Sequence, residues 1–336
     1  MIKKGILLVN LGTPDSPSVK DVRKYLREFL MDKRVIDLPF LTRWLLINLI
    51  IVPFRGPKSA AIYKQLWTKK GSPLLYHGIE LKDNLQKLLG INYHVAFAMR
   101  YQKPSIKSAL EELKRGNVSA IKVIPLYPQY ASSSTGSTIA KIMEIVKKDI
   151  SVPPISFVSS FCDLPELTNA FASNGKKHLD RENFDHILFS YHGLPERHLK
   201  KGDSNNHCFG SDTCCQELTE KNQLCYRAQC FETTKHIVKK LGLKDSEYTI
   251  AFQSRLETRA KDPWIKPYSD IVLTGLAKKG VKKVLVFSPA FVADCLETTV
   301  EIGIEYQELF EENGGEKIQL VESLNGNADW LLPLCK

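Results

Sequence analysis

One histidine follows a short apolar stretch of the kind that forms a buried strand. His192 comes directly after ILFSY (187–191), and Gly193 and Pro195 would turn the chain sharply behind it. A neutral imidazole at the carboxyl end of a strand can bind a metal ion or accept a proton near pH 7. The alternative interpretation is a histidine that only caps the strand by hydrogen bonding, as lone histidines often do.

Three glutamates recur at helical spacing after the apolar run VLVFSPAF (284–291). Glu297, Glu301 and Glu305 are four residues apart, so they share one face of the helix predicted over 296–311. Like charges at this spacing repel one another, and no lysine lies in the same stripe. Such a row can bind a hydrated divalent cation or relay protons. Alternatively, it is a solvated acidic face near a helix N-terminus, where negative charge is favourable.

Five of the eight cysteines fall within 23 residues, in the pattern C-x5-C-C-x9-C-x4-C. The segment 199–229, which holds most of them, is rich in Lys, Asp, Asn and Ser, so core packing explains the cluster poorly. Thiolates in such a group bind an iron–sulfur cluster or a structural zinc ion. We favour the cluster because the two CxxC pairs of a zinc ribbon are missing. The five cysteines are Cys208, Cys214, Cys215, Cys225 and Cys230. A metal centre of this kind needs four ligands, so one of the five is spare, and the spacing does not identify which one.

Two further segments could contact a ligand. Ser132 begins SSSTGST (132–138), whose hydroxyl and amide groups could hold a carboxylate or phosphate before a helix. The same residues would also serve as an ordinary helix cap. The apolar stretch 38–54 is either a core helix or an exposed lip that admits an apolar ligand or touches a bilayer.

These candidate residues must be held in place by helices and strands. Along the chain, short apolar runs alternate with longer amphipathic stretches. This alternation predicts an α/β fold with parallel sheets. The predicted strands are 5–11, 94–100, 120–126, 155–161, 186–191, 248–253, 283–288 and 318–321. The predicted helices include 19–31, 106–115, 137–148, 231–241 and 296–311.

The two halves of the chain are weakly similar to each other. ILLVNLGTP (6–14) is echoed by ILFSYHGLP (187–195), with a glycine and a proline at the same offsets. We therefore predict two similar domains, 1–152 and 153–336, the second with a last helix that could pack back on the first. Ligands of open α/β sheets bind beyond the carboxyl ends of the strands, where these motifs lie.

Composition excludes several classes of protein. With 43% apolar and 25% charged residues, the chain is neither disordered nor fibrous. The net charge of +10 permits acidic partners, but no nucleic-acid motif accompanies it. The longest apolar run, 44–54, is short for a membrane span, and no signal peptide is recognisable. We expect a cytoplasmic protein with reduced cysteines; the sequence does not indicate an oligomeric state.

The ordered set of motifs resembles the ferrochelatases, which insert ferrous iron into protoporphyrin IX. The resemblance covers nearly the whole chain, and four segments carry it best: GILLVNLGTPDSP (5–17), PLYPQYASSSTGS (125–137), LFSYHGLPERHLKKGD (188–203) and FVADCLETTVEI (291–302). It implies a lyase of haem synthesis with two similar Rossmann-like domains, each with a four-stranded parallel sheet flanked by helices. The substrates would be a porphyrin and Fe2+.

The resemblance also implies roles for individual residues. His192 and Glu297 would bind iron and remove pyrrole protons, and Glu301 and Glu305 would conduct metal or protons. The porphyrin pocket would include Met99, Arg100, Tyr130 and Ser132. The stretch 30–54 would form an apolar lip around its mouth and could contact the inner membrane peripherally. The cysteine segment resembles that of a bacterial subgroup with a 2Fe–2S cluster, which implies a cluster held by four of the five cysteines.

Two alternatives and one departure from the family remain at this point. The enzyme could act on coproporphyrin III, a tetracarboxylate, or the chain could be a non-catalytic tetrapyrrole or metal-binding protein on the same scaffold. The segment between Arg255 and Trp264 carries a short insertion relative to the commoner pattern of the family.

Overall fold

The computed structural model describes residues 3–211, 213–255 and 263–336, so most of the insertion before Trp264 lies outside the described residues. The chain forms two compact units, which we describe separately. Unit 1 comprises residues 1–127, 132–159 and 325–336, and unit 2 comprises residues 128–131 and 160–324.

Unit 1 is built on a parallel sheet with strand order β2-β1-β3-β4. The strands are β1 (Lys3–Gly12), β2 (Tyr93–Tyr101), β3 (Val118–Pro125) and β4 (Ile155–Phe157). The middle of β1 is buried on both faces, as its unbroken apolar run predicts. Helices α5 (Ile106–Arg115) and α6 (Ser137–Val146) share one core cluster with β1 and β2. Helix α4 (Pro73–Leu89) packs against β2, where Gly78 lies against the ring of Phe97.

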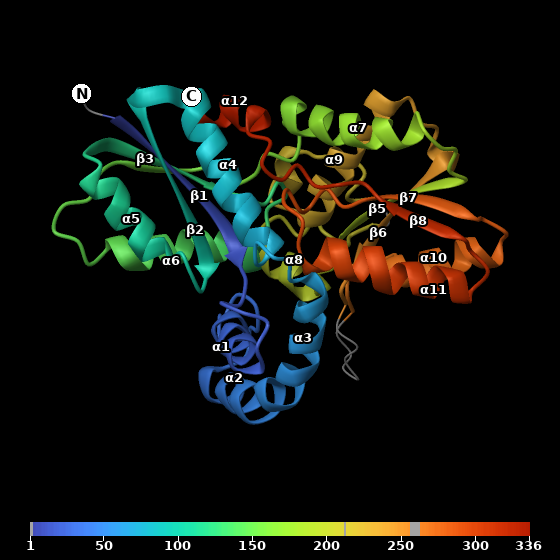
Figure 1. Ribbon diagram of the computed structural model, residues 1–336, viewed down its shortest axis with the longest axis horizontal. Helices are drawn as coiled ribbons and strands as arrows, with labels where there is room; N and C mark the ends of the chain where they lie inside the picture. Colours follow the sequence, from blue (N-terminus) through green and yellow to red (C-terminus); the bar gives the residue numbers. More distant parts are fainter. Residues whose placement is uncertain (1–2, 212, 256–262) are drawn as a thin grey trace. The chain divides into compact units, whose positions relative to one another are not determined.

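Helix α1 (Val19–Leu30) and a long second helix lie together beyond the carboxyl end of β1 (Figure 1). The long helix consists of α2 (Phe40–Leu45), a π-helical stretch η1 (Leu46–Ile51) and α3 (Val52–Leu66). Pro53 follows the π-helical stretch, and a proline has no N–H to continue the α-helical pattern. At 27 residues, this helix is longer than the apolar run alone suggests. Within the described residues it is the one helix that is long and apolar enough to cross a membrane.

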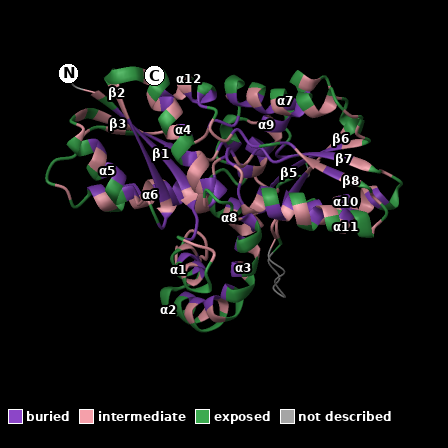
Figure 2. Ribbon diagram, viewed as in Figure 1, coloured by how far each residue is buried: buried purple, intermediate pink, exposed green. Residues whose placement is uncertain are grey.

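The two faces of this long helix differ in exposure (Figure 2). Ile47, Val52 and Ala60 are buried on one face, and Gly56 lies against the Arg23 side chain of α1. The other face carries large apolar side chains that are 56–73% exposed: Phe40, Leu41, Leu49, Ile50 and Phe54. The exposure of these side chains argues against the interpretation of this segment as a core helix.

Unit 2 repeats the arrangement of unit 1 with strand order β6-β5-β7-β8, all parallel. The strands are β5 (His186–His192), β6 (Tyr248–Gln253), β7 (Lys283–Phe287) and β8 (Lys317–Leu320). Its long helices are α7 (Pro165–Leu179), α9 (Tyr226–Leu241) and α10 (Ser269–Lys278). The predicted fold class, two four-stranded parallel sheets flanked by helices, is confirmed.

The helix that carries the glutamate row differs from the prediction. It begins as a π-helix, η6 (Leu296–Tyr306), and only its end, α11 (Gln307–Glu312), is α-helical. A π-helix takes more residues per turn than an α-helix, so residues four apart are slightly less than one turn apart. The remaining short helices are η2 (Gly90–Asn92), η3 (Ser132–Gly136), α8 (Glu196–Gly202), η4 (Glu220–Asn222), η5 (Asp245–Glu247), η7 (Asp329–Leu331) and α12 (Leu332–Cys335).

Candidate functional site

His192 is the last residue of β5, and its ring is oriented by the residue that follows it. The Nδ1 atom lies 2.6 Å from the carbonyl oxygen of Gly193. A carbonyl oxygen only accepts hydrogen bonds, so Nδ1 carries the proton of the neutral ring. The lone pair is therefore on Nε2, and this half-buried imidazole can accept a proton or bind a metal ion there.

The turn behind His192 requires a glycine. The Gly193 N–H donates to the backbone carbonyl of Gln253 over 2.8 Å. A Cβ atom at position 193 would lie 2.7 Å from that oxygen, closer than van der Waals contact allows. The glycine expected from the sequence thus brings the ends of β5 and β6 together.

Glu297 lies in the first turn of η6, half-buried, beside a cysteine. Burial and the negative charge of Glu297 raise the pKa of the Cys295 thiol, which is therefore protonated and hydrogen-bonds to the carboxylate. Cys295 is itself buried. This buried thiol donor holds one side of the Glu297 carboxylate.

The carboxylate of Glu301 is occupied by four hydrogen bonds from the protein. Its donors are the backbone N–H of Ser254 (2.8 Å), the Ser254 hydroxyl, the Gln253 amide (3.2 Å) and the Tyr306 hydroxyl (3.1 Å). Ser254 has φ = 61°, in the left-handed region that serine rarely adopts. Glu301 therefore anchors the strained end of β6.

Glu305, the third glutamate of the row, is exposed on the surface. Partial desolvation of its carboxyl group and the charges of Glu301 and Glu308 raise its pKa. The three carboxylates thus have different surroundings: one beside a buried thiol, one saturated with donors, and one facing solvent.

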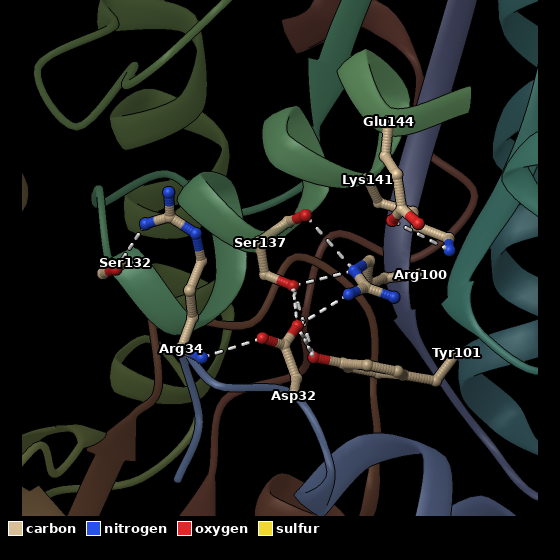
Figure 3. A network of polar contacts seen from close by, with 8 residues as sticks. All are labelled: Asp32, Arg34, Arg100, Tyr101, Ser132, Ser137, Lys141 and Glu144. Atoms are coloured by element: carbon tan, nitrogen blue, oxygen red, sulfur yellow. Dashed lines mark hydrogen bonds and ion pairs between the residues drawn. The ribbon is translucent and has the colours of Figure 1, made fainter. Parts of the chain in front are cut away.

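Arg100 and Ser132, predicted to contact the porphyrin, take part in a polar network of unit 1 (Figure 3). Arg100 Nη2 lies 2.6 Å from Asp32 Oδ2, and Arg100 Nε donates to the Ser137 hydroxyl over 2.7 Å. Ser132 accepts a hydrogen bond of 2.8 Å from Arg34 Nη1. The predicted contacts are thus engaged within the protein, and Met99 is fully buried in β2.

Asp32 is the centre of this network, although no sequence motif points to it. Its Oδ2 atom also accepts hydrogen bonds from the hydroxyls of Tyr101 and Ser137. Burial alone would raise the pKa of Asp32, but these hydroxyls, the Arg34 N–H and the charge of Arg100 hold it below the ordinary value. Asp32 could not be found from the sequence because its side-chain partners, Arg100, Tyr101 and Ser137, are distant in the chain.

Tyr130, the fourth predicted porphyrin contact, belongs to unit 2 and is held by a buried glutamine of α9. Gln229 Oε1 accepts hydrogen bonds from the Tyr130 N–H (2.6 Å) and the Ser160 hydroxyl (2.9 Å). The Gln229 amide donates to the carbonyl of Gln223, in the cysteine segment. One side chain therefore connects the cysteine segment to the backbone of Tyr130.

Four of the five clustered cysteines form a chain of contacts. The Sγ atoms of Cys214 and Cys215 are 3.4 Å apart, and those of Cys215 and Cys225 are 3.8 Å apart. The thiol of Cys208 contacts Cys225. The fifth, Cys230, is fully buried one turn further along α9 beside Tyr226. The structure therefore separates Cys230 from the other four.

The surroundings of Cys225 suit a thiolate, whereas burial raises the pKa of the Cys208 thiol and the hydrogen bond to Cys225 raises the pKa of the Cys215 thiol. The thiol of Cys215 hydrogen-bonds to the sulfur of Cys225 and, with backbone N–H groups at the start of α9, lowers the pKa of Cys225. The Phe209 N–H donates to Cys214 Sγ over 3.3 Å. Sulfur ligands at about 2.3 Å from a tetrahedral metal ion lie about 3.8 Å apart. The Sγ separations of 3.4 and 3.8 Å are close to this value, but within the described residues no group of three or more His, Cys, Asp or Glu side chains is arranged so that it could hold a metal ion.

The main residue that sequence reasoning missed near His192 is Gln253, at the end of β6. It is 1% exposed, lies opposite His192 in the sheet, and reaches η6 with its side chain. It ends the predicted strand 248–253, but its type alone gave no signal because a glutamine at a strand end is usually solvated.

Comparisons with known proteins agree over nearly the full length of the chain. The ferrochelatase family model matches residues 3–336. A ferrochelatase of Legionella pneumophila (strain Corby) is 46% identical over 330 residues, which cover 98% of this chain and 97% of that protein. A ferrochelatase of Coxiella burnetii (strain CbuK_Q154) is 44% identical over 334 residues, which cover 99% and 92% of the two chains.

Two solved structures share the fold. They are SirB from Bacillus subtilis with Fe3+, with a TM-score of 0.50, and the sirohydrochlorin chelatase SirB from Bacillus subtilis subspecies spizizenii in complex with cobalt, with a TM-score of 0.51. Each is 12% identical and covers 99% of this chain and 93% of its own. At this identity, the likeness concerns the fold alone. The full-length family match and the two relatives above 40% identity show that this chain belongs to the ferrochelatase family.

Proposed function

We propose that this protein is a ferrochelatase, a lyase that inserts Fe2+ into protoporphyrin IX and releases two protons. Membership of the family supports the activity. The observation that carries the assignment to a site is the orientation of His192, whose Nδ1 atom is bound to the Gly193 carbonyl. This hydrogen bond leaves Nε2 available as a base or a metal ligand.

Metal insertion requires a group that accepts protons near neutral pH. Two pyrrole N–H protons must leave the porphyrin while Fe2+ loses water, and a neutral imidazole can accept a proton under these conditions. Glu297 contributes a carboxylate that can accept the second proton or help to bind the ion. Glu301 and Glu305 extend an acidic path along η6, with Glu305 at its exposed end.

Substitution of these two residues tests the proposal. His192→Ala should lower the rate of Fe2+ insertion about 100-fold or more, the range expected for loss of a general base. His186→Ala is a matched control, because His186 lies at the other end of β5 and its ring Nε2 lies 2.9 Å from the Thr249 hydroxyl. Glu297→Gln should also lower the rate strongly, whereas Glu308→Gln, on an exposed position, should not. Normal insertion by the His192 variant would refute the assignment.

The same assay decides between the porphyrin substrates. We propose protoporphyrin IX, and parallel measurements with coproporphyrin III test this choice. A higher kcat/KM on coproporphyrin III would overturn the choice of substrate but not the reaction. Tight porphyrin binding without insertion by the unmodified protein would point to a non-catalytic binding protein instead.

We further propose that Cys208, Cys214, Cys215 and Cys225 hold a 2Fe–2S cluster, and that Cys230 is the spare cysteine. The contacts among the four sulfurs and the N–H groups directed at them support this ligand set. A structural zinc ion held by the same thiolates is the alternative. When bound, either centre would fix the conformation of the polar segment before α9.

Metal analysis of the purified protein distinguishes these two centres. Iron and acid-labile sulfide in near-equal amounts would support the cluster, whereas zinc without sulfide would support the structural zinc site. Cys215→Ser should abolish the metal content. Cys230→Ser is the matched control and should retain it; loss of metal in this variant would contradict the assignment of the spare cysteine.

We also propose that the protein is cytoplasmic and contacts the inner membrane peripherally through the long helix Phe40–Leu66. One face of this helix packs on the protein, since Arg23 donates to the Pro53 carbonyl over 3.0 Å and Arg27 to the Asn48 side chain over 2.8 Å. A helix held in this way on one face, with large apolar side chains on the other, suits the interface of a bilayer.

Binding to vesicles tests this contact. Phe54→Asp should weaken binding to vesicles that contain anionic lipid, measured by co-sedimentation. Ile91→Asp is a matched control, because Ile91 is 72% exposed, close to the 73% of Phe54, but lies outside the long helix. Equal binding by both variants, or none by the unmodified protein, would refute the contact.

A further inference from the structure

The two residues proposed to handle protons lie on different elements of unit 2. His192 ends β5, and Glu297 lies in the first turn of η6. Their relative position depends on what joins these elements. The side chain of Gln253, the last residue of β6, makes that connection.

The Gln253 amide is buried and fully hydrogen-bonded. Its Nε2 donates to the backbone carbonyl of Glu297 (2.8 Å) and to Glu301 Oε2 (3.2 Å), and its Oε1 accepts from the Ser190 hydroxyl (2.7 Å). Its backbone carbonyl accepts from the N–H of Gly193 (2.8 Å). Gln253 therefore contacts residues on both sides of His192 and the backbone of Glu297.

Chemistry fixes the orientation of this amide. The Glu297 carbonyl and the Glu301 carboxylate only accept hydrogen bonds, so the NH2 group must face them. The Ser190 hydroxyl then donates its single proton to Oε1, and the Ser269 hydroxyl, 2.8 Å away, donates to Ser190. The amide group cannot be turned by 180°, because Oε1 would then face two hydrogen-bond acceptors, the Glu297 carbonyl and the Glu301 carboxylate.

We infer that Gln253 is a positioning residue that sets the geometry between His192 and Glu297. This inference rests on the proposed function. A glutamate at this position has the same shape but no NH2 group, so it would face the Glu301 carboxylate and the Glu297 carbonyl without a donor. The start of η6 would then move away from the end of β5.

The experiment compares Gln253→Glu and Gln253→Met with the unmodified protein. For each we would measure kcat, KM for Fe2+, KM for the porphyrin, and the melting temperature. We expect kcat to fall at least tenfold and KM for Fe2+ to rise, with KM for the porphyrin within twofold of the unmodified value. Ser190→Ala, which removes one contact of the amide, should give a smaller change in the same direction.

Gln319→Glu is a matched control. Gln319 lies in β8 of the same sheet, and its amide donates to the Leu320 carbonyl over 2.9 Å. This variant should keep the kinetic constants. Normal kcat and KM for Fe2+ in Gln253→Met would overturn the inference. A parallel loss of porphyrin binding and melting temperature in both Gln253 variants would also overturn it, in favour of a general structural role. Lack of insertion by the unmodified protein would refute the proposed function instead.

Discussion

The substitution Asp32→Asn should destabilise unit 1 by about 3 kcal/mol. Asp32 and Arg100 form an ion pair whose side chains are only 8% and 12% exposed. Asparagine keeps the size of the side chain but removes its charge. The loss of one charge-assisted hydrogen bond costs about 1.5–3 kcal/mol. Arg100 would in addition be left as an unpaired cation in a nearly buried site.

Urea unfolding measures this effect. Three of the four tryptophans, Trp44, Trp67 and Trp330, belong to unit 1, so tryptophan fluorescence reports mainly on that unit. With a slope of roughly 1–3 kcal/mol per molar urea, the midpoint should fall by about 1–3 M. A change below about 0.5 kcal/mol, the value of an exposed ion pair, would refute the reasoning.

The pH dependence provides a second measurement on the same residue. The folded-state pKa of Asp32 lies below its ordinary value of about 3.9. Its contribution to stability is therefore present above about pH 4 and is lost as the pH falls through the folded-state pKa. The Asp32→Asn protein should lose less stability than the unmodified protein between about pH 5 and pH 3. An identical acid dependence of both proteins would show that Asp32 is not linked to folding in this way.

Three other substitutions have defined expectations. Gly193→Ala should lower the rate of metal insertion at least tenfold, because the added Cβ would lie 2.7 Å from the Gln253 carbonyl oxygen. The circular dichroism spectrum should be unchanged. A fully active variant would argue against the tight turn. Trp330→Ala should destabilise unit 1 by about 3–5 kcal/mol in urea unfolding, because the side chain is 1% exposed. Gly78→Ala should cost about 1–3 kcal/mol, since a Cβ there would lie 2.2 Å from the ring of Phe97. Unchanged urea midpoints would contradict either of these two estimates.

The sheets were predictable because parallel strands buried on both faces leave an unmistakable apolar run. All eight predicted strands are present, with β6 matching at both ends. The last strand of unit 1 was predicted too long, over 155–161, because Phe161 is apolar as well. It is instead buried in unit 2, where its N–H bonds to the Pro128 carbonyl. An apolar pattern indicates that a residue is buried, but it does not indicate whether that residue belongs to the strand before it.

Candidate site residues could be named from the sequence only where local spacing carries the signal. His192 followed by a glycine, and Glu297 at a helix start, could be named from their neighbours in the chain. The π-helical form of η6 could not be predicted, because the spacing of its glutamates fits an α-helix equally well. Asp32 and Gln253 were missed because their importance comes from partners 44 to 105 residues away. Such partners are set by the topology of the sheets.

The composition of unit 1 has a consequence for protein synthesis. Residues 325–336, which include the buried Trp330, belong to the same unit as the first strand. A ribosome makes these residues after all of 160–324, so unit 2 can fold while unit 1 still lacks a part of its core. Nascent chains stalled before residue 325 should therefore expose an incomplete amino-terminal sheet assembly to chaperones and proteases, even when the second half has already folded.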